Sequence, residues 1–118
     1  MASIEELKKY CSITVDRHER GAYVLSFSFG EAVTTVRVVF MDVQSGADMA
    51  ITHMTTLPAK KRQNGFGSHA LRSLLDWARR YGIRDIQAVQ VQTPSEKFWE
   101  RNGFVKIGNI TNDFRYVL

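Results

Sequence analysis

The residues best suited to chemistry form one short segment, Arg62–Ser68, where basic residues and glycines meet a helical pattern. Free backbone N–H groups at a helix start, with the helix dipole, form an anion site. Gly65 and Gly67 would let a pyrophosphate approach the backbone without a Cβ in the way, and Lys60 and Lys61 can add charge-assisted contacts. The segment therefore predicts a phosphate-binding loop. The alternative is a solvated basic turn whose glycines serve only its geometry.

This spacing differs from two well-known phosphate loops. It lacks the Lys-Ser/Thr pair of a Walker loop and the third glycine of a dinucleotide fingerprint, so both of those families fit poorly.

Extended patterns precede the loop. Four segments with alternating or β-branched apolar residues predict strands, the last three as an antiparallel meander: Ser12–Asp16, Ala22–Phe29, Val33–Met41 and Met49–Leu57. Ser3 followed by Glu6 has capping-box spacing, which predicts a short helix over Ile4–Tyr10. The stretch Asp42–Asp48 is predicted to be a loop.

Helical and extended patterns alternate after the loop. Apolar residues at three- and four-residue steps predict a helix from Phe66 that Gly82 ends. The remaining predicted elements are an interior strand, a second helix and two closing strands: Ile86–Val91, Thr93–Asn102, Phe104–Ile107 and Asp113–Leu118. The order α-β-β-β-β-α-β-α-β-β predicts an α/β (α+β) mixed sheet flanked by helices.

Composition sets limits on the class of protein. A chain of 118 residues with 44% apolar and 24% charged residues predicts one globular domain over 1–118. The single cysteine, Cys11, excludes an intrachain disulfide, and the histidines lack zinc-site spacing, so no metal is predicted. The sequence shows no apolar leader and no run long enough for a membrane span, which predicts a cytoplasmic protein. A net charge of +4 favours an anionic partner, although many soluble proteins carry such a charge without one.

Two motifs resemble those of a known family. Arg62-x-x-Gly65-x-Gly67 after a strand resembles the acetyl-CoA pyrophosphate signature of the GNAT superfamily of N-acetyltransferases. The segment Phe98–Phe104, Phe-Trp-Glu-Arg-Asn-Gly-Phe, is similar to the family's FY-x-x-x-GF segment. The resemblance covers roughly Met49–Phe104. It implies a mixed sheet whose two central strands splay apart, with acetyl-CoA lying between them.

The resemblance also implies a set of cofactor contacts. The strand Ile51–Leu57 would pair its backbone with the pantetheine arm, and the amides of Gln63–Ser68 would hold the pyrophosphate. The residues expected at the cofactor are Thr55, Thr56, Leu57, Arg62, Gln63, Asn64, Gly65, Phe66, Gly67, Ser68 and Trp99.

The sequence departs from the family pattern at two places. The pair of helices that usually follows the first strand is missing, or reduced to the turn-rich stretch Asp16–Gly21. Trp99 stands where many relatives have a tyrosine that protonates the leaving thiolate. An indole cannot act as that acid, so we expect Trp99 to be structural and to close one wall of the wedge beside the acyl arm.

Few residues are candidates for acid–base roles. An imidazole titrates near neutrality, so His53, on the strand beside the expected thioester, is the candidate base; the alternative is a histidine satisfied by hydrogen bonds. Asp48 could act through a water molecule. Tyr116, on the last strand, is the candidate proton donor. His69 is expected to face solvent, and Cys11 is not expected to carry the acyl group.

These features predict an N-acetyltransferase that transfers an acetyl group by direct attack of a primary amine. The acceptor would be a small amine, a peptide N-terminus or a lysine. The alternative is a non-catalytic acyl-CoA-binding regulatory module, which the missing tyrosine supports. Nucleic acid is a disfavoured partner because the basic residues do not interleave with aromatic ones. A homodimer is left open.

Overall fold

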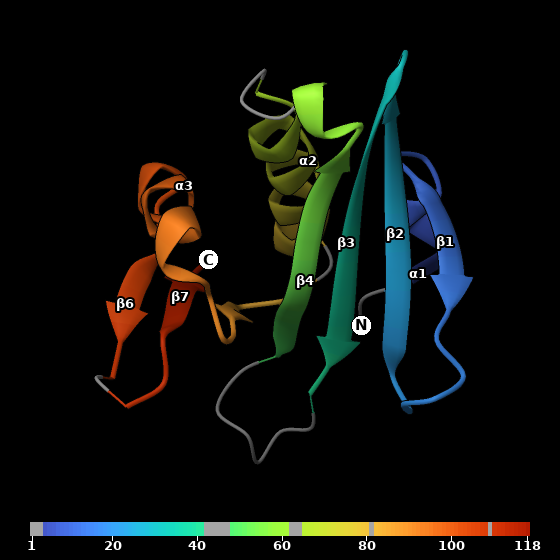
Figure 1. Cartoon of the computed structure of the whole chain (residues 1–118). Helices are drawn as coiled ribbons and strands as arrows, with labels where there is room; N and C mark the ends of the chain where they lie inside the picture. The colour runs from blue at the N-terminus through green and yellow to red at the C-terminus, as the bar shows by residue number, and fades with distance from the viewer. Residues whose placement is uncertain (1–3, 42–47, 62–64, 81, 109) are drawn as a thin grey trace.

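A computed structural model describes residues 4–41, 48–61, 65–80, 82–108 and 110–118. One mixed sheet carries all seven strands in the order β1-β2-β3-β4-β5-β7-β6 (Figure 1). The elements are α1 (Ile4–Leu7), β1 (Ser12–Val15), β2 (Ala22–Phe29), β3 (Ala32–Phe40), β4 (Met49–Leu57), the 3₁₀ turn η1 (Ala59–Lys61), α2 (Phe66–Arg80), β5 (Asp85–Ala88), the 3₁₀ turn η2 (Thr93–Ser95), α3 (Glu96–Arg101), β6 (Val105–Ile107) and β7 (Asp113–Val117). The predicted fold class and element order are confirmed.

Strands β1 to β4 form an antiparallel meander, and β4 then pairs with β5 in parallel. The register places Leu25, Val36 and Met54 side by side on the face that α2 covers. Because side chains alternate across a strand, the intervening residues lie on the opposite face, which we call the open face. The Asp16–Gly21 connection is a turn between β1 and β2, as expected for the missing helix pair.

The core lies between the sheet and α2. The largest side chains with almost no exposed surface come from α1, α2 and five strands: Trp77, Phe114, Leu7, Leu25, Met49, Leu71, Leu74, Ile86, Val36 and Val38. Burying apolar groups of this size stabilises a fold by about 1.5–3 kcal/mol each relative to leaving them exposed. This core fixes the position of α2 against the sheet, including β4.

Helix α2 ends where its sequence predicted. Gly82 has a φ of +81°, the left-handed conformation that glycine adopts readily. The N–H of Ile83 donates to the carbonyl of Ala78 at 3.0 Å, which satisfies one of the last helical carbonyls. The helix is therefore closed by a glycine cap and does not continue toward β5.

Three predicted boundaries differ from the observed ones by more than one residue. Helix α1 stops at Leu7, after which the N–H groups of Lys8, Lys9 and Tyr10 donate to carbonyls three residues earlier, as in turns. Strand β5 stops at Ala88, because Gln90 adopts a positive φ of 54° and its N–H bonds the side chain of Asp113. The second helix begins as the 3₁₀ turn η2. Ser3 of the expected capping box and positions 42–47 of the expected loop lie outside the described residues.

Candidate functional site

The two central strands part soon after they meet. The β4–β5 ladder joins Met49–Ile51 to Ile86–Ala88, and its last contact is the Val89 N–H on the Ile51 carbonyl at 3.1 Å. The chain then turns toward β7, where the Val91 N–H donates to the Asn112 carbonyl. Beyond Ile51, β4 continues to Leu57 without β5 beside it. This parting of β4 and β5 is the arrangement that the resemblance implied.

The first turn of α2 follows the far end of β4. Gly65 precedes the helix, and its carbonyl accepts the N–H of His69 at 3.0 Å. The amides of Phe66–Ser68 have no carbonyl one turn earlier in the helix, which is the condition for an anion site at a helix start. Lys60, in η1, lies shortly before this turn in the sequence, and its side chain is exposed. Arg62, Gln63 and Asn64 lie outside the described residues.

The two glycines of the motif have different surroundings. Gly65 has a φ of +82°, and among the described residues other than its chain neighbour, a Cβ built on it would meet no heavy atom within 4 Å. A Cβ on Gly67 would lie 3.2 Å from Cε1 of Phe98 and 3.7 Å from the methyl carbon of Met54. Gly65 thus serves backbone conformation. At Gly67 the Cβ direction points at α3, so the structure adds a helix-packing role to the expected one.

Neighbouring elements hold this first turn from two sides. Phe66 stacks on Phe29 of β2, with ring centroids 5.1 Å apart and planes inclined by 11°. On the other side, Nδ2 of Asn102 donates to Ser68 Oγ at 3.2 Å and to the Phe98 carbonyl at 2.8 Å. The amides of the first turn are therefore held in place by β2 and by the end of α3.

The strand residues expected along the pantetheine arm have different environments. Thr56 is buried, and its hydroxyl shares a 2.7 Å hydrogen bond with that of Thr34. Thr55 is half-buried, and Leu57 is 54% exposed. Thr56 is thus part of the β3–β4 packing, whereas Leu57 offers apolar surface at the end of the strand.

His53 lies on the open face of β4 and is exposed. Arg37 of β3 is its cross-strand partner in the register. The side chain is accessible to a substrate on that face, as a base would need to be. His69 is also exposed, as expected, with its ring edge-to-face against Phe29.

Trp99 is part of the core. It is 6% exposed, and its ring lies edge-to-face with those of Phe98 at 5.2 Å and Phe104 at 5.0 Å. These contacts account for a large aromatic residue at this position by packing.

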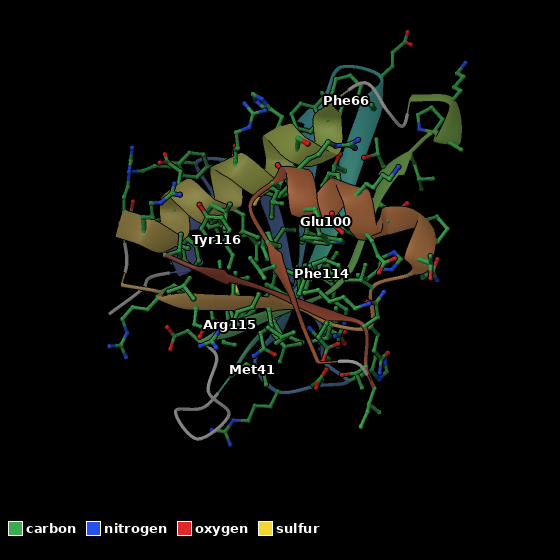
Figure 2. All side chains as sticks on the ribbon, turned by 90° about the vertical axis from the view of Figure 1, so that its left-hand side faces the viewer. Met41, Phe66, Glu100, Phe114, Arg115 and Tyr116 are labelled. Atoms are coloured by element: carbon green, nitrogen blue, oxygen red, sulfur yellow. The ribbon has the colours of Figure 1, made fainter. Side chains whose placement is uncertain are left out.

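Tyr116 lies apart from His53. Its hydroxyl accepts a hydrogen bond from Nη2 of Arg79 at 2.9 Å, at the C-terminal end of α2. Figure 2 shows Phe66 and Tyr116 near opposite ends of that helix, which is about 20 Å long at 1.5 Å per residue. In the sheet, Tyr116 pairs with Ile86, beside the first residue of β4. The structure therefore does not bring the candidate acid to the candidate base.

Two other candidates have structural partners. The Asp48 carboxylate accepts the N–H of Arg84 at 2.7 Å, at the start of β4. Burial raises the pKa of the Cys11 thiol to about 11, so at neutral pH this group is protonated and a poor nucleophile. This agrees with the expectation that Cys11 does not carry the acyl group.

Sequence reasoning missed two groups beside the site. One is the Arg37 cluster on the open face, with Asp16, Glu19 and Thr52. A lone arginine in a β-branched strand was a signal that it has partners, but their identities have no local pattern. The other is the Asn102–Ser68 hydrogen bond.

A shallow hollow of about 520 Å³ lies between η2 and the β6–β7 turn. Its described lining contains no residue of β4 or α2, so we do not assign it to this site.

The mixed sheet, its parted strands β4 and β5 and the helix start beside them form the arrangement that the resemblance to GNAT acetyltransferases implied. The model of the acetyltransferase (GNAT) family matches residues 2–104. The chain therefore belongs to the GNAT acetyltransferase family. No curated protein matches the sequence.

Solved structures with this fold differ widely in sequence. A GNAT-family protein from Desulfovibrio desulfuricans has a TM-score of 0.68 at 15% identity, over 82% of this chain and 69% of that one. Tetrahymena GCN5 has a TM-score of 0.65 at 9% identity, over 84% and 69%. AtaTR bound with acetyl-CoA has a TM-score of 0.57 at 14% identity, over 81% and 66%. The present chain thus spans about two thirds of these proteins. None of its described helices is long and apolar enough to cross a membrane.

Proposed function

We propose that this protein is an N-acetyltransferase that uses acetyl-CoA to acylate a primary amine. The observation that carries the proposal is the first turn of α2, whose amides follow a strand that has parted from its neighbour. Of the described residues beyond its chain neighbour, none lies within 4 Å of where a Cβ of Gly65 would be. The pyrophosphate would bind the amides of Gly65–Ser68, with Lys60 adding charge. The arm of the cofactor would lie along β4 toward Thr55.

The reaction requires little from the protein besides position and a base. The neutral amine nitrogen attacks the thioester carbonyl carbon, a C–N bond forms and the C–S bond breaks. His53 accepts the proton from the amine. Its side chain is exposed on the open face of β4, where an amine can reach it. The CoA thiolate leaves and takes a proton from water, which is feasible because a thiol of this kind has a pKa of about 8.5. No acid from Trp99 or Tyr116 is needed in this scheme.

The second candidate function is a non-catalytic acyl-CoA-binding module, which fits the environments of Trp99 and Tyr116 as well as the transfer scheme does. Trp99 is buried among aromatic rings and Tyr116 is hydrogen-bonded to Arg79. A protein that binds acetyl-CoA without transferring the acetyl group would not need an acid at either position.

Labelled acetyl-CoA distinguishes these functions. The protein is incubated with three groups of acceptors, namely polyamines, peptides with a free N-terminus and lysine-bearing proteins, and acetyl-CoA binding is followed by thermal shift. Label transfer with saturable binding supports the enzyme. Saturable binding without transfer to any group supports the binding module. An unchanged melting temperature across a wide acetyl-CoA titration contradicts both.

A further inference from the structure

One arginine joins three parts of the open face beside His53. Arg37 lies between the buried residues Val36 and Val38 of β3, so strand alternation places it on the face away from α2. Its three guanidinium nitrogens donate to three different groups: Nε to Asp16 Oδ2 at 2.9 Å, Nη1 to Thr52 Oγ1 at 2.9 Å, and Nη2 to Glu19 Oε1 at 2.8 Å.

The β4 residue in this cluster is the extra residue of a β-bulge. Arg37 pairs with His53 and Val38 pairs with Ile51, so Thr52 is left between two successive pairs. The Thr52 hydroxyl also donates to the Arg37 carbonyl at 3.4 Å. Arg37 thus contacts the bulged residue through its side chain and its backbone. Bulges redirect the side chains beside them, and the next side chain is His53.

The other two partners belong to the turn between β1 and β2. Asp16 and Glu19 lie in this turn, which occupies the place of the missing helix pair. The Arg37 side chain is only 25% exposed and that of Asp16 is 18% exposed, so water screens this pair less than a fully exposed one. A planar guanidinium can hold three acceptors in fixed directions, whereas a lysine ammonium is a single point donor.

We propose that Arg37 is a positioning residue, which fixes the Thr52 bulge against the Asp16–Gly21 turn and thereby sets the direction of His53. The effect on turnover rests on the proposed function, in which His53 is the base. The effect on the bulge is independent of the proposed function.

Amide hydrogen exchange and kinetics together test this role. Arg37→Met removes all three contacts, Arg37→Lys keeps the charge without the fork, and Thr52→Val removes only the hydroxyl contacts. Arg115→Met is the matched control, because Arg115 pairs with Asp85 on the same face but in β7. Exchange is measured at the Thr52–Met54 amides and corrected for global stability by urea unfolding. Turnover is measured with the acceptors described above.

We expect Arg37→Met to speed local exchange at Thr52–Met54 about tenfold, with a smaller rise in Arg37→Lys and Thr52→Val and none in Arg115→Met. We expect kcat to fall about tenfold while the KM for acetyl-CoA stays within about twofold, because misplacing a base slows chemistry and spares cofactor binding.

Exchange at Thr52–Met54 that is unchanged in Arg37→Met, or raised equally in Arg115→Met, overturns the proposal. If Arg37→Met does not fold, Thr52→Val decides the matter by the same two measurements. If the wild type acetylates none of the acceptors, the proposed function fails, and the exchange result still decides the structural role of Arg37.

Discussion

Gly67 and Phe98 bring the first turn of α2 and the helix α3 into contact, and a Cβ at the glycine would be tight against the Phe98 ring. A Cβ on Gly67 would lie 3.2 Å from the Phe98 ring. The glycine motif at the start of α2 and the aromatic motif of α3, far apart in sequence, are therefore in contact in the fold.

A substitution pair separates this packing role from the role of Gly65. We expect Gly67→Val to abolish the stabilisation by acetyl-CoA, about 2.7 kcal/mol at a hundredfold excess over Kd, because the helix start must move off Phe98. Adding Phe98→Ala to Gly67→Val should restore part of this stabilisation, because the smaller side chain makes space for the valine. Gly65→Val should also abolish it, through its positive φ, and Phe98→Ala should bring no rescue there. Thermal shift across an acetyl-CoA titration measures all four variants. Equal rescue at both glycines would contradict the distinction.

His53 is expected to control the acidic side of the pH–rate profile. His53→Gln keeps a polar side chain of similar size on the open face but cannot accept a proton, so turnover should fall on the order of 10²-fold and the acidic limb should disappear. His69→Gln is the control, because His69 is also exposed but lies on α2 against Phe29. An acidic limb that persists in His53→Gln with its midpoint unmoved would place the base elsewhere.

Trp99 is expected to matter for stability rather than for chemistry. Trp99→Phe should preserve most of the turnover and lower the free energy of unfolding, because a smaller ring leaves space beside Phe98 and Phe104. Trp99→Tyr places a hydroxyl in a buried position and should cost about 1–3 kcal/mol if that group finds no partner. Urea unfolding and kcat are compared for each variant. A thousandfold loss of kcat in Trp99→Phe, with folding and acetyl-CoA affinity intact, would assign the indole a chemical role.

The Asp16 carboxylate makes the free energy of unfolding depend on pH in the acidic range. The N–H of His18, and then Arg37, hold its pKa below the usual 3.8. A carboxyl whose pKa is lower in the folded state stabilises the fold above its unfolded pKa, and this contribution is lost as the pH falls through the folded value. We expect the free energy of unfolding to decline below about pH 4, and less steeply in Asp16→Asn.

Urea unfolding between neutral pH and pH 2.5 measures this difference. Asp76→Asn is the control, since Asp76 pairs with Arg80 at 3.5 Å on an exposed helix face and exposed pairs contribute little. If Asp16→Asn and the wild type lose stability in parallel, the carboxylate does not contribute as described.

Local sequence patterns determined much of the secondary structure of this protein. The β2 segment Ala22–Phe29 and the β4 segment Met49–Leu57 were predicted with their observed bounds, because alternation and β-branching act between neighbours in sequence. The end of α2 at Gly82 followed from the freedom of glycine at positive φ. The start of α2 at Phe66 followed from the change of period there.

Tertiary structure alone decided the details of the candidate site. The bulge at Thr52, the three partners of Arg37 and the hydrogen bond from Asn102 to Ser68 join residues that are 15 to 34 positions apart. No periodicity encodes such pairs, since each depends on how the sheet twists and where α3 packs. Tyr116 shows the same limit: its residue type made it a candidate acid, and the pairing of β7 with β5 places it near Met49 at the start of β4, apart from His53. Residue types and spacing name the groups that can do chemistry, whereas the packing of distant elements decides which of those groups meet.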